Sequence, residues 1–215
     1  MKKFITFEGI EGSGKSTQIK LVAEYLSQKN VSLIVTQEPS GTEIGRKIGG
    51  ILFDRKNNNM CEKTEMFLFC AARAQHVRDV IMPALKQGKI VLCDRFSDAT
   101  YAYQGAGRGL DEKFIGLVND YSSMLLKPDL TLLFDLPVEV GLQRANKRND
   151  NLKESSSIDR FEKETLDFHK KIRAGYLRLL KNDPDRFCLI DANRDVNTIQ
   201  NEVRQCISNF INLKI

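Results

Sequence analysis

The segment GIEGSGKST, residues 9–17, combines glycines and polar side chains suited to holding phosphate groups. It fits the pattern G-x-x-x-x-G-K-[ST], in which the glycines let backbone N–H groups converge on an anion. The amine of Lys15 can reach the β- and γ-phosphates of a nucleotide, and the hydroxyl of Ser16 can bind Mg²⁺. The pattern therefore predicts a nucleoside triphosphate site. Its members are Gly9, Ile10, Glu11, Gly12, Ser13, Gly14, Lys15, Ser16 and Thr17.

An acidic side chain follows another apolar run, KIVLCD at residues 89–94. Asp94 ends a segment with the pattern of a buried strand, and an acid in that place can hold Mg²⁺ through water. The segment NKRN, residues 146–149, lacks the final aspartate of the N-K-x-D pattern with which GTPases recognise guanine. The loop therefore predicts binding of ATP or GTP, and the missing guanine motif favours a kinase over a switch protein.

The elements that would position these groups alternate between strands and helices. This alternation predicts a parallel sheet with helices on both faces, and ligands of such sheets bind beyond the carboxyl ends of the strands. The predicted fold class is α/β, a P-loop NTPase three-layer αβα sandwich with a five-stranded parallel sheet. The expected strands are 3–8, 32–38, 89–94, 130–135 and 187–192. The clearest helical periodicity lies in 15–29, 63–88 with a kink near Pro83, and 195–211.

The polar segment RANKRNDNLKESSSIDR, residues 144–160, lies between two helical patterns, and its middle has the composition of a loop. It is interpreted either as a solvated surface loop or as a short mobile lid whose arginines face a phosphate. The arginines concerned are Arg144, Arg148 and Arg160. The length of 215 residues favours a single domain, 1–215, with this lid at about 144–160.

Composition excludes some classes of protein. The net charge is +5, but Lys and Arg are spread along the chain, which favours a phosphate-binding enzyme over a nucleic-acid binder. The N-terminus lacks the pattern of a signal peptide, and no apolar run approaches the ~20 residues of a membrane span. The five cysteines form no C-x-x-C pair, so they are interpreted as reduced core residues of a cytoplasmic protein. They are Cys61, Cys70, Cys93, Cys188 and Cys206.

Several further motifs resemble those of the thymidylate kinase family, in its bacterial type. The resemblance runs from about residue 3 to the last helix, and its motifs are FEGIEGSGKST, EPSGT, FLFCAARAQH, CDRFSDATYAYQG, GRGLD, KPDLTLLFDLP, GLQRA, DRFE and LIDA. It implies a nucleoside monophosphate kinase-like domain that uses ATP and Mg²⁺ to phosphorylate dTMP to dTDP, in the supply of dTTP for DNA synthesis. It also implies small-molecule nucleotides as partners and a homodimer built through its helices.

The resemblance implies an acceptor pocket for dTMP. Phe69 and Arg73, one helical turn apart, would stack on thymine and donate to one of its carbonyl groups. Tyr103 would lie under the deoxyribose, where a ribose 2′-hydroxyl would clash. Family members often have a cis Glu–Pro bond at the EPSGT motif. The implied dTMP-binding residues are Glu11, Glu38, Pro39, Phe69, Arg73, Arg95, Thr100, Tyr103 and Gln104.

The resemblance also implies where the catalytic charges lie. Some family members carry an arginine in the phosphate loop, in the place of Gly12, and members without it use lid arginines. Arg95 would hold the acceptor phosphate, and Arg144 would stack on adenine. Ser16 would bind Mg²⁺ directly and Asp94 through water. The implied catalytic residues are Lys15, Arg95, Arg148 and Arg160.

Four positions depart from the usual family motifs: Gln37, Ser40, Phe96 and Ala99. Two other functions stay open on the sequence. One is a small kinase on the same scaffold that acts on a different nucleoside or nucleoside monophosphate. The other is a non-catalytic module that binds nucleotides or nucleic acid, which would leave Glu11, Phe69 and Arg73 without a shared purpose.

Overall fold

A computed structural model describes residues 3–151, 160–161 and 164–213 of the chain, with side chains described up to residue 147 in the first of these ranges. Its centre is a five-stranded sheet in the order β2-β3-β1-β4-β5, with every neighbouring pair parallel. The strands are β1 Phe4–Glu8, β2 Leu33–Gln37, β3 Ile90–Asp94, β4 Leu130–Asp135 and β5 Phe187–Asp191. This confirms the predicted α/β architecture and all five predicted strands, each within one residue at either end.

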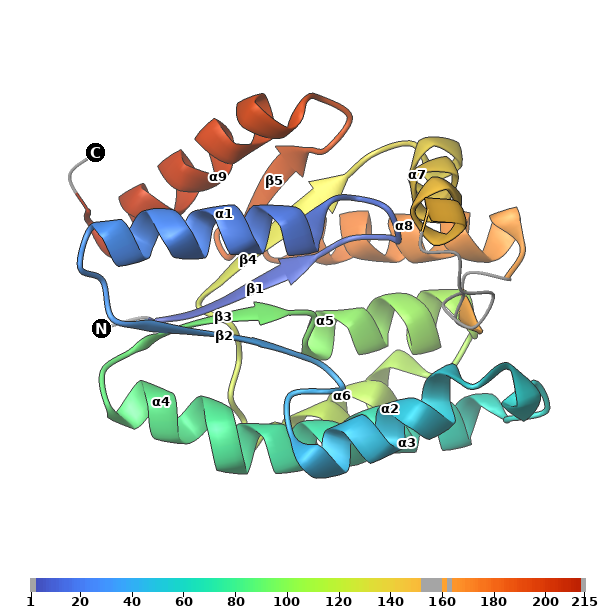
Figure 1. Cartoon of the computed structure of the whole chain (residues 1–215). Helices are drawn as coiled ribbons and strands as arrows, with labels where there is room; N and C mark the ends of the chain where they lie inside the picture. The colour runs from blue at the N-terminus through green and yellow to red at the C-terminus, as the bar shows by residue number, and fades with distance from the viewer. Residues whose placement is uncertain (1–2, 152–159, 162–163, 214–215) are drawn as a thin grey trace.

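Helices form a layer on each face of the sheet (Figure 1). Helices α1 and α9 pack together on one face, and α3, α4, α5 and α8 lie on the other. The α-helices are α1 Lys15–Gln28, α2 Glu43–Phe53, α3 Glu62–His76, α4 Met82–Lys86, α5 Ser97–Thr100, α6 Glu112–Ser122, α7 Val138–Asn151, α8 Leu166–Asn182 and α9 Val196–Ile211. Three short elements complete the described chain: the 3₁₀ turn η1 Arg55–Asn57 and the π-helical segments η2 Val77–Ile81 and η3 Tyr101–Gly107.

The core explains why the strands form where they do. Every residue of β1 is fully buried, and β3 and β4 are buried up to their final aspartates. Strands covered on both faces are continuous apolar runs, which is the pattern that predicted them. Each large apolar side chain removed from water contributes roughly 1.5–3 kcal/mol to folding. No helix in the described part of the chain is both long and apolar enough to cross a membrane.

The predicted long helix 63–88 is interrupted. Helix α3 passes into the π-helical segment η2, and α4 continues from it with Pro83 in its first turn. Proline lacks the N–H that would bond the carbonyl four residues earlier, at Asp79, and its ring crowds that carbonyl. The π-helical segment η2 lies just before Pro83, so the helix departs from regular α geometry on the N-terminal side of the proline.

Helix α7 extends into the segment predicted as a lid. The chain is helical to Asn151, so the first half of the predicted lid at 144–160 is the end of a helix. Residues 152–159, the predicted loop centre, lie outside the described residues. The helix is rich in Arg, Asn, Lys and Asp, and its apolar residues lie mainly in its first two turns, which is why its length did not show in the sequence.

The cysteines are a second correction. Cys188 and Cys206 form a disulfide, with their Cα atoms 6.8 Å apart, because β5 and α9 pack against each other. The interpretation that all five are reduced core residues is therefore wrong for these two. It is also wrong for Cys61, which is a thiol but exposed. Cys70 and Cys93 are buried thiols, as expected. The argument for a cytoplasmic location from reduced cysteines is correspondingly weaker.

Candidate active site

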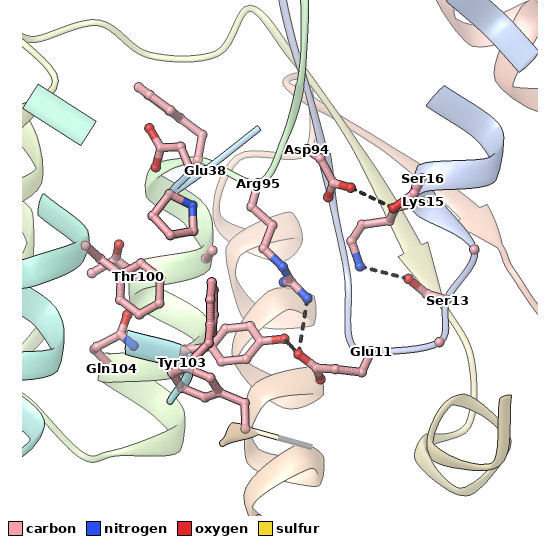
Figure 2. Close-up of a pocket in the computed structure, with 18 of the residues that line it drawn as sticks. Glu11, Ser13, Lys15, Ser16, Glu38, Asp94, Arg95, Thr100, Tyr103 and Gln104 are labelled. Carbon is pink, nitrogen blue, oxygen red and sulfur yellow. Dashed lines mark hydrogen bonds and ion pairs between the residues drawn. The ribbon is translucent and has the colours of Figure 1, made fainter. Parts of the chain in front are cut away.

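A cavity of about 420 Å³ opens where the carboxyl ends of β1 and β3 meet the start of α1. The phosphate loop lines one end, and residues from α3, α5 and η3 line the other. Figure 2 shows both halves facing each other across one space. The lining includes every residue of the predicted dTMP set, together with Lys15, Asp94 and Arg144. Gly9 and Ile10, predicted to bind ATP, do not line it, and neither does Arg160.

The phosphate loop is folded around the amine of Lys15. Its Nζ donates to the carbonyl oxygens of Gly9 and Ile10, both at 3.0 Å, and to Ser13 Oγ at 3.2 Å. Gly9 and Ile10 thus hold the lysine in place. Burial, with the neighbouring charge of Arg95, lowers the pKa of Lys15 to about 8. Because a buried amine gains from a nearby anion, the loop is suited to bind phosphate.

Ser16 and Asp94 form the predicted metal pair. Ser16 Oγ donates to Asp94 Oδ2 at 3.0 Å, which joins the first turn of α1 to the end of β3 (Figure 2). Both groups are hard oxygen ligands of the kind Mg²⁺ prefers, and Mg²⁺ keeps several waters and binds substrate phosphates with few protein ligands. The described residues contain no cluster of three or more His, Cys, Asp or Glu side chains that would hold a metal alone. The donor set therefore fits Mg²⁺ shared with a nucleotide.

Gly12 lies against the backbone of α7. It has a φ of +70°, and a Cβ built on it would lie 1.9 Å from the carbonyl oxygen of Gly141. A Cβ on Gly141 would in turn lie 2.6 Å from the carbonyl oxygen of Glu11. Helix α7 thus occupies the space that a side chain at position 12 would need. An arginine at position 12 would therefore collide with α7 in this packing.

Glu11 connects the two halves of the cavity. Its Oε1 accepts from Arg95 at 3.2 Å and from the hydroxyl of Tyr103, and its Oε2 lies 3.3 Å from His169 Nδ1. Burial by itself raises the pKa of Glu11, but His169, Arg95 and Tyr103 outweigh it and hold the pKa at about 2. The carboxylate is therefore charged at neutral pH and faces the space between loop and acceptor pocket.

Arg95 is held in an unusual backbone conformation directly after β3. Its φ is +65°, and its guanidinium donates to the carbonyl oxygen of Gly9 at 3.0 Å and to Tyr176 Oη at 3.1 Å. The guanidinium also lies over the ring of Tyr103, 4.8 Å from its centroid. These contacts fix a planar, bidentate donor at the centre of the cavity, where it suits a phosphate oxygen pair.

Arg73 is buried and is hydrogen-bonded through its guanidinium to other residues of the protein. It is 1% exposed, and it pairs with Glu38, at 2.9 Å from both Nε and NH2. It also donates to Asn119 Oδ1 at 2.6 Å and to Thr100 Oγ1 at 3.1 Å. The Arg73–Glu38 ion pair is buried, with the side chains 2% and 4% exposed. The cis Glu38–Pro39 bond implied by the resemblance is present. The Glu38 carboxylate contacts both Arg73 and His76.

Aromatic rings surround the acceptor end. Phe69 is half-buried and lies in edge or tilted contact with Phe53 and Phe161, at centroid distances of 6.4 and 6.0 Å. Tyr103 contacts Phe161 at 5.8 Å. The result is an apolar slot with a polar end formed by Arg73, Thr100 and Gln104. A flat heterocycle with hydrogen-bonding groups on one edge fits such a slot.

The arginines of the predicted lid differ in their positions. Arg144 lines the cavity and donates to the carbonyl oxygen of Ala192 at 2.8 Å, close to the loop after β5. Arg148 lies on α7, and its side chain is outside the described residues. Arg160 points away from the cavity: it donates to the carbonyl oxygen of Leu52 at 3.2 Å and to Glu65 at 2.6 Å. The structure does not bring Arg160 to the phosphate loop.

The four departures from the family motifs occupy different environments. Phe96 is fully buried, with its ring 4.8 Å from Phe4 and 5.2 Å from the Arg73 guanidinium. Ala99 is half-buried and lines the cavity. Gln37 is exposed at the end of β2, and Ser40 lies outside the main cavity. Only Phe96 and Ala99 are therefore placed to affect a ligand directly.

Sequence reasoning missed three polar residues beneath the cavity: Glu8, His169 and Tyr176. Glu8 accepts from the backbone N–H of Phe96 at 2.8 Å and from Tyr176 Oη at 2.7 Å. All three are buried. His169 and Tyr176 are seven residues apart on α8, so they share its buried face with Ile172. Polar residues on the apolar stripe of a helix were the signal that could have found them.

Glu8 predicts a pH dependence of stability. Burial, with a contribution from the charge of Asp98, raises the pKa of Glu8 from its ordinary 4.5 to about 8. A folded state that binds the proton more tightly is favoured at low pH, so this carboxyl makes the free energy of unfolding fall as the pH rises from 4.5 to 8. Glu8→Gln removes that effect. The stability of the variant relative to wild type should therefore increase between pH 5 and pH 8.

Urea unfolding at pH 5, 6.5 and 8 measures this difference. Glu11 does not interfere, because its depressed pKa gives stability that is complete above 4.5 and is lost only as the pH falls toward 2. A difference between variant and wild type that stays constant over the range would show that Glu8 is ionised in the folded protein.

Comparisons with known proteins agree with this geometry. The model of the thymidylate kinase family matches residues 7–203. The thymidylate kinase of Syntrophus aciditrophicus is 52% identical over 203 residues, covering 94% of this chain and 93% of that protein. The thymidylate kinase of Desulfovibrio desulfuricans is 45% identical over 208 residues, covering 97% and 96%. The crystal structure of thymidylate kinase from Ehrlichia chaffeensis has a TM-score of 0.76 at 32% identity, covering 96% of this chain and 98% of that one.

The range matched by the family model, residues 7–203, contains the phosphate loop and every residue that lines the cavity. The five-stranded parallel sheet with its phosphate loop is accordingly the P-loop NTPase fold predicted from the sequence. The chain belongs to the thymidylate kinase family of nucleoside monophosphate kinases.

Proposed function

We propose that the chain transfers the γ-phosphoryl group of ATP to dTMP, giving ADP and dTDP, with Mg²⁺ as cofactor. The observation that carries this proposal is the position of Glu11 in the phosphate loop, bonded to Arg95 and Tyr103 of the acceptor half. The two half-sites share one cavity through these contacts. The reaction would contribute to the supply of dTTP for DNA synthesis, and we propose the cytoplasm as its location.

In the proposed reaction, an oxygen of the acceptor phosphate attacks the γ-phosphorus of ATP. The bond from that phosphorus to the β–γ bridging oxygen breaks, and ADP takes the electron pair. The attacking oxygen is already anionic, so no protein group needs to remove a proton. Lys15 would neutralise charge on the donor phosphates while Arg95 holds the acceptor in line, so catalysis comes from positioning and electrostatics.

The remaining phosphate contacts follow from where the side chains lie. Ser16 would bind Mg²⁺ directly and Asp94 through water, and the ion supplies charge neutralisation between the β- and γ-phosphates. Arg144, at the mouth of the cavity, would stack on adenine. Arg160 would first have to leave Glu65 and Leu52, so we assign the lid contact with the transferring phosphate to Arg148.

The proposed base pocket is the slot between Phe69 and the polar groups at its end. Phe69 would stack on thymine, and Thr100 and Gln104 would contact its edge. Tyr103 and Glu11 lie where a deoxyribose would fit between base and phosphate, with Pro39 forming another wall of the cavity. Because the hydroxyl of Tyr103 is bonded to Glu11, a ribose 2′-hydroxyl would compete for this space.

The decisive experiment measures ADP formation by the purified protein with Mg²⁺, ATP and each nucleoside monophosphate in turn. A strong preference for dTMP supports the proposal. Preference for another acceptor would support kinase activity but would overturn the assignment of the pocket to dTMP. Binding of ATP without turnover of any acceptor would favour the non-catalytic alternative.

Arg73 provides a test of the acceptor pocket. Arg73→Ala should weaken dTMP binding while ATP binding changes little, because Arg73 lies at the base end of the cavity and far from the phosphate loop. Its loss also removes the guanidinium partner of the buried Glu38 carboxylate and leaves it beside His76, and breaking a buried ion pair in this way destabilises a protein by roughly 3–5 kcal/mol. The double variant Glu38→Gln with Arg73→Met removes both charges together and should bind dTMP as weakly with less loss of stability.

Calorimetric titration with each nucleotide measures the two affinities, and Glu38→Gln alone is the control for the carboxylate. Unchanged dTMP affinity in a folded Arg73 variant would show that the base binds elsewhere.

A homodimer is the second proposal from the family. Helices α3 and α6 carry an exposed apolar surface, with Leu117 71% and Tyr121 91% exposed, and the rings of Phe67 and Phe114 at 6.3 Å. Surfaces of this kind mark interfaces, and a two-fold axis would bury the patch against itself. Leu117→Glu should convert a two-chain particle to a single chain in light scattering. Val196→Glu, on the opposite helical layer, should remain dimeric, and a wild-type mass of one chain would contradict the dimer.

A further inference from the structure

Glu65 is a buried carboxylate outside the set assigned to the reaction. It lies in the first turn of α3, is fully buried and lines no part of the cavity. Four N–H groups donate to it: Gln104 Nε2 at 2.9 Å, Arg108 Nε and NH2 both at 3.2 Å, and Arg160 NH2 at 2.6 Å. A carboxylate offers about four acceptor sites, so these donors saturate it.

This arrangement fixes the orientation of the Gln104 amide. A carboxylate accepts hydrogen bonds and cannot donate them, so only the NH₂ of Gln104 can face Glu65. Turning the amide over would place its oxygen against the Oε1 of Glu65, two acceptors at 2.9 Å. Gln104 is 2% exposed and lines the cavity, next to Thr100 (Figure 2). Its carbonyl oxygen is therefore the group that it offers to a ligand.

A second charged group fixes the neighbouring hydroxyl. Arg73 NH2 donates to Thr100 Oγ1 at 3.1 Å, and a guanidinium has no acceptor. The Thr100 hydroxyl therefore accepts from Arg73 and keeps its own hydrogen to donate, and Thr100 lines the cavity. Two buried charged side chains thus give the polar end of the slot one donor, from Thr100, and one acceptor, from Gln104.

We infer that Glu65 is a positioning residue that selects the acceptor base by fixing which way the Gln104 amide faces; this inference rests on the proposed function. A base with a carbonyl next to a ring N–H, as in thymine and uracil, matches a donor beside an acceptor. Cytosine presents an amino group beside an unprotonated ring nitrogen, which is the reverse pattern. A mismatch leaves buried polar groups unpaired, and sites of this kind reject the wrong partner strongly.

The test compares kcat/KM for dTMP with kcat/KM for dCMP and follows the ratio of the two. Where turnover of dCMP is too slow to measure, inhibition of dTMP turnover by dCMP reports the discrimination instead. In Glu65→Gln, either the oxygen or the NH₂ group of the Gln104 amide can point toward position 65. The ratio should therefore fall by about 10- to 100-fold. Glu65→Asp keeps the charge for both arginines while moving the carboxylate back from Gln104, and should lower the ratio with a smaller loss of stability.

Two controls separate positioning from general damage. Arg108→Met removes another partner of Glu65 and should lower the melting temperature without changing the ratio. In a Gln104→Met background, Glu65→Gln should leave the ratio unchanged, because the group through which Glu65 acts is gone.

The outcomes are distinct. An unchanged ratio in folded, active Glu65→Gln and Glu65→Asp would overturn the inference, as would an equal change in the Gln104→Met background. Wild-type protein that fails to use dTMP would overturn the proposed function itself. That failure is visible before any variant is made.

Discussion

Lys15→Met is expected to lower kcat by about 10³-fold, the scale on which removal of a charge or donor from a developing anion slows phosphoryl and acyl transfer. The amine is buried and held by Gly9, Ile10 and Ser13, so no other cation of the loop can move into its place without rebuilding it. Methionine keeps most of the volume and removes the charge. Initial rates at saturating dTMP and ATP measure the effect.

Lys20→Met is the matched control, because Lys20 is an exposed lysine one turn further along α1. It should have wild-type kcat. A loss of less than tenfold for Lys15→Met, with the protein still folded, would mean that the transferring phosphate does not lie in this loop.

Arg95→Met is expected to lower kcat/KM for dTMP by about 10³-fold, comparable to the loss of an arginine that contacts a transferring phosphoryl group. Arg95 NH1 donates to the carbonyl of Gly9 and to Tyr176, so the guanidinium is positioned before any ligand binds. The variant also removes a partner of the Glu11 carboxylate. Steady-state kinetics with dTMP varied at saturating ATP separate KM from kcat.

Two further variants test why Arg95→Met loses activity. Glu11→Gln tests whether the loss comes from an unpaired carboxylate, since it removes that charge and keeps Arg95. Arg173→Met removes a partly exposed arginine, paired with Asp135 on the neighbouring strand, and should leave kinetics unchanged. If Arg95→Met raised KM for ATP and not for dTMP, Arg95 would belong to the donor half of the site.

The predictable part of the fold depended on signals local to a few residues. The strands were visible because buried parallel strands are continuous apolar runs, and the phosphate loop because its glycines and lysine follow a strand directly. Asp94 and Arg95 were visible for the same reason, at the end of β3. The edge of the sheet that carries the site was predictable from the general rule that ligands bind beyond the carboxyl ends of the strands. The order of the strands was not predicted, and the residues of the acceptor half were assigned from the family resemblance.

The rest depends on contacts between segments distant in sequence. Arg160 pairs with Glu65 across 95 positions, and no local pattern distinguishes that buried ion pair from a phosphate contact. The disulfide of Cys188 and Cys206 depends on how α9 lies on β5. Arg73 was assigned to the base pocket from the family motif that it shares with Phe69, but its pairing with Glu38 and Asn119 required the packed structure.

The contact between Gly12 and Gly141 limits how this lineage of enzymes can change. An arginine at position 12 would displace the helix that carries Arg144 and Arg148, so a single substitution would disturb the arginines that we propose to contact the nucleotide. A chain with this packing can reach the loop-arginine arrangement only by changes at both sites together. We therefore expect a chimera that exchanges the loop alone, with α7 unchanged, to be inactive.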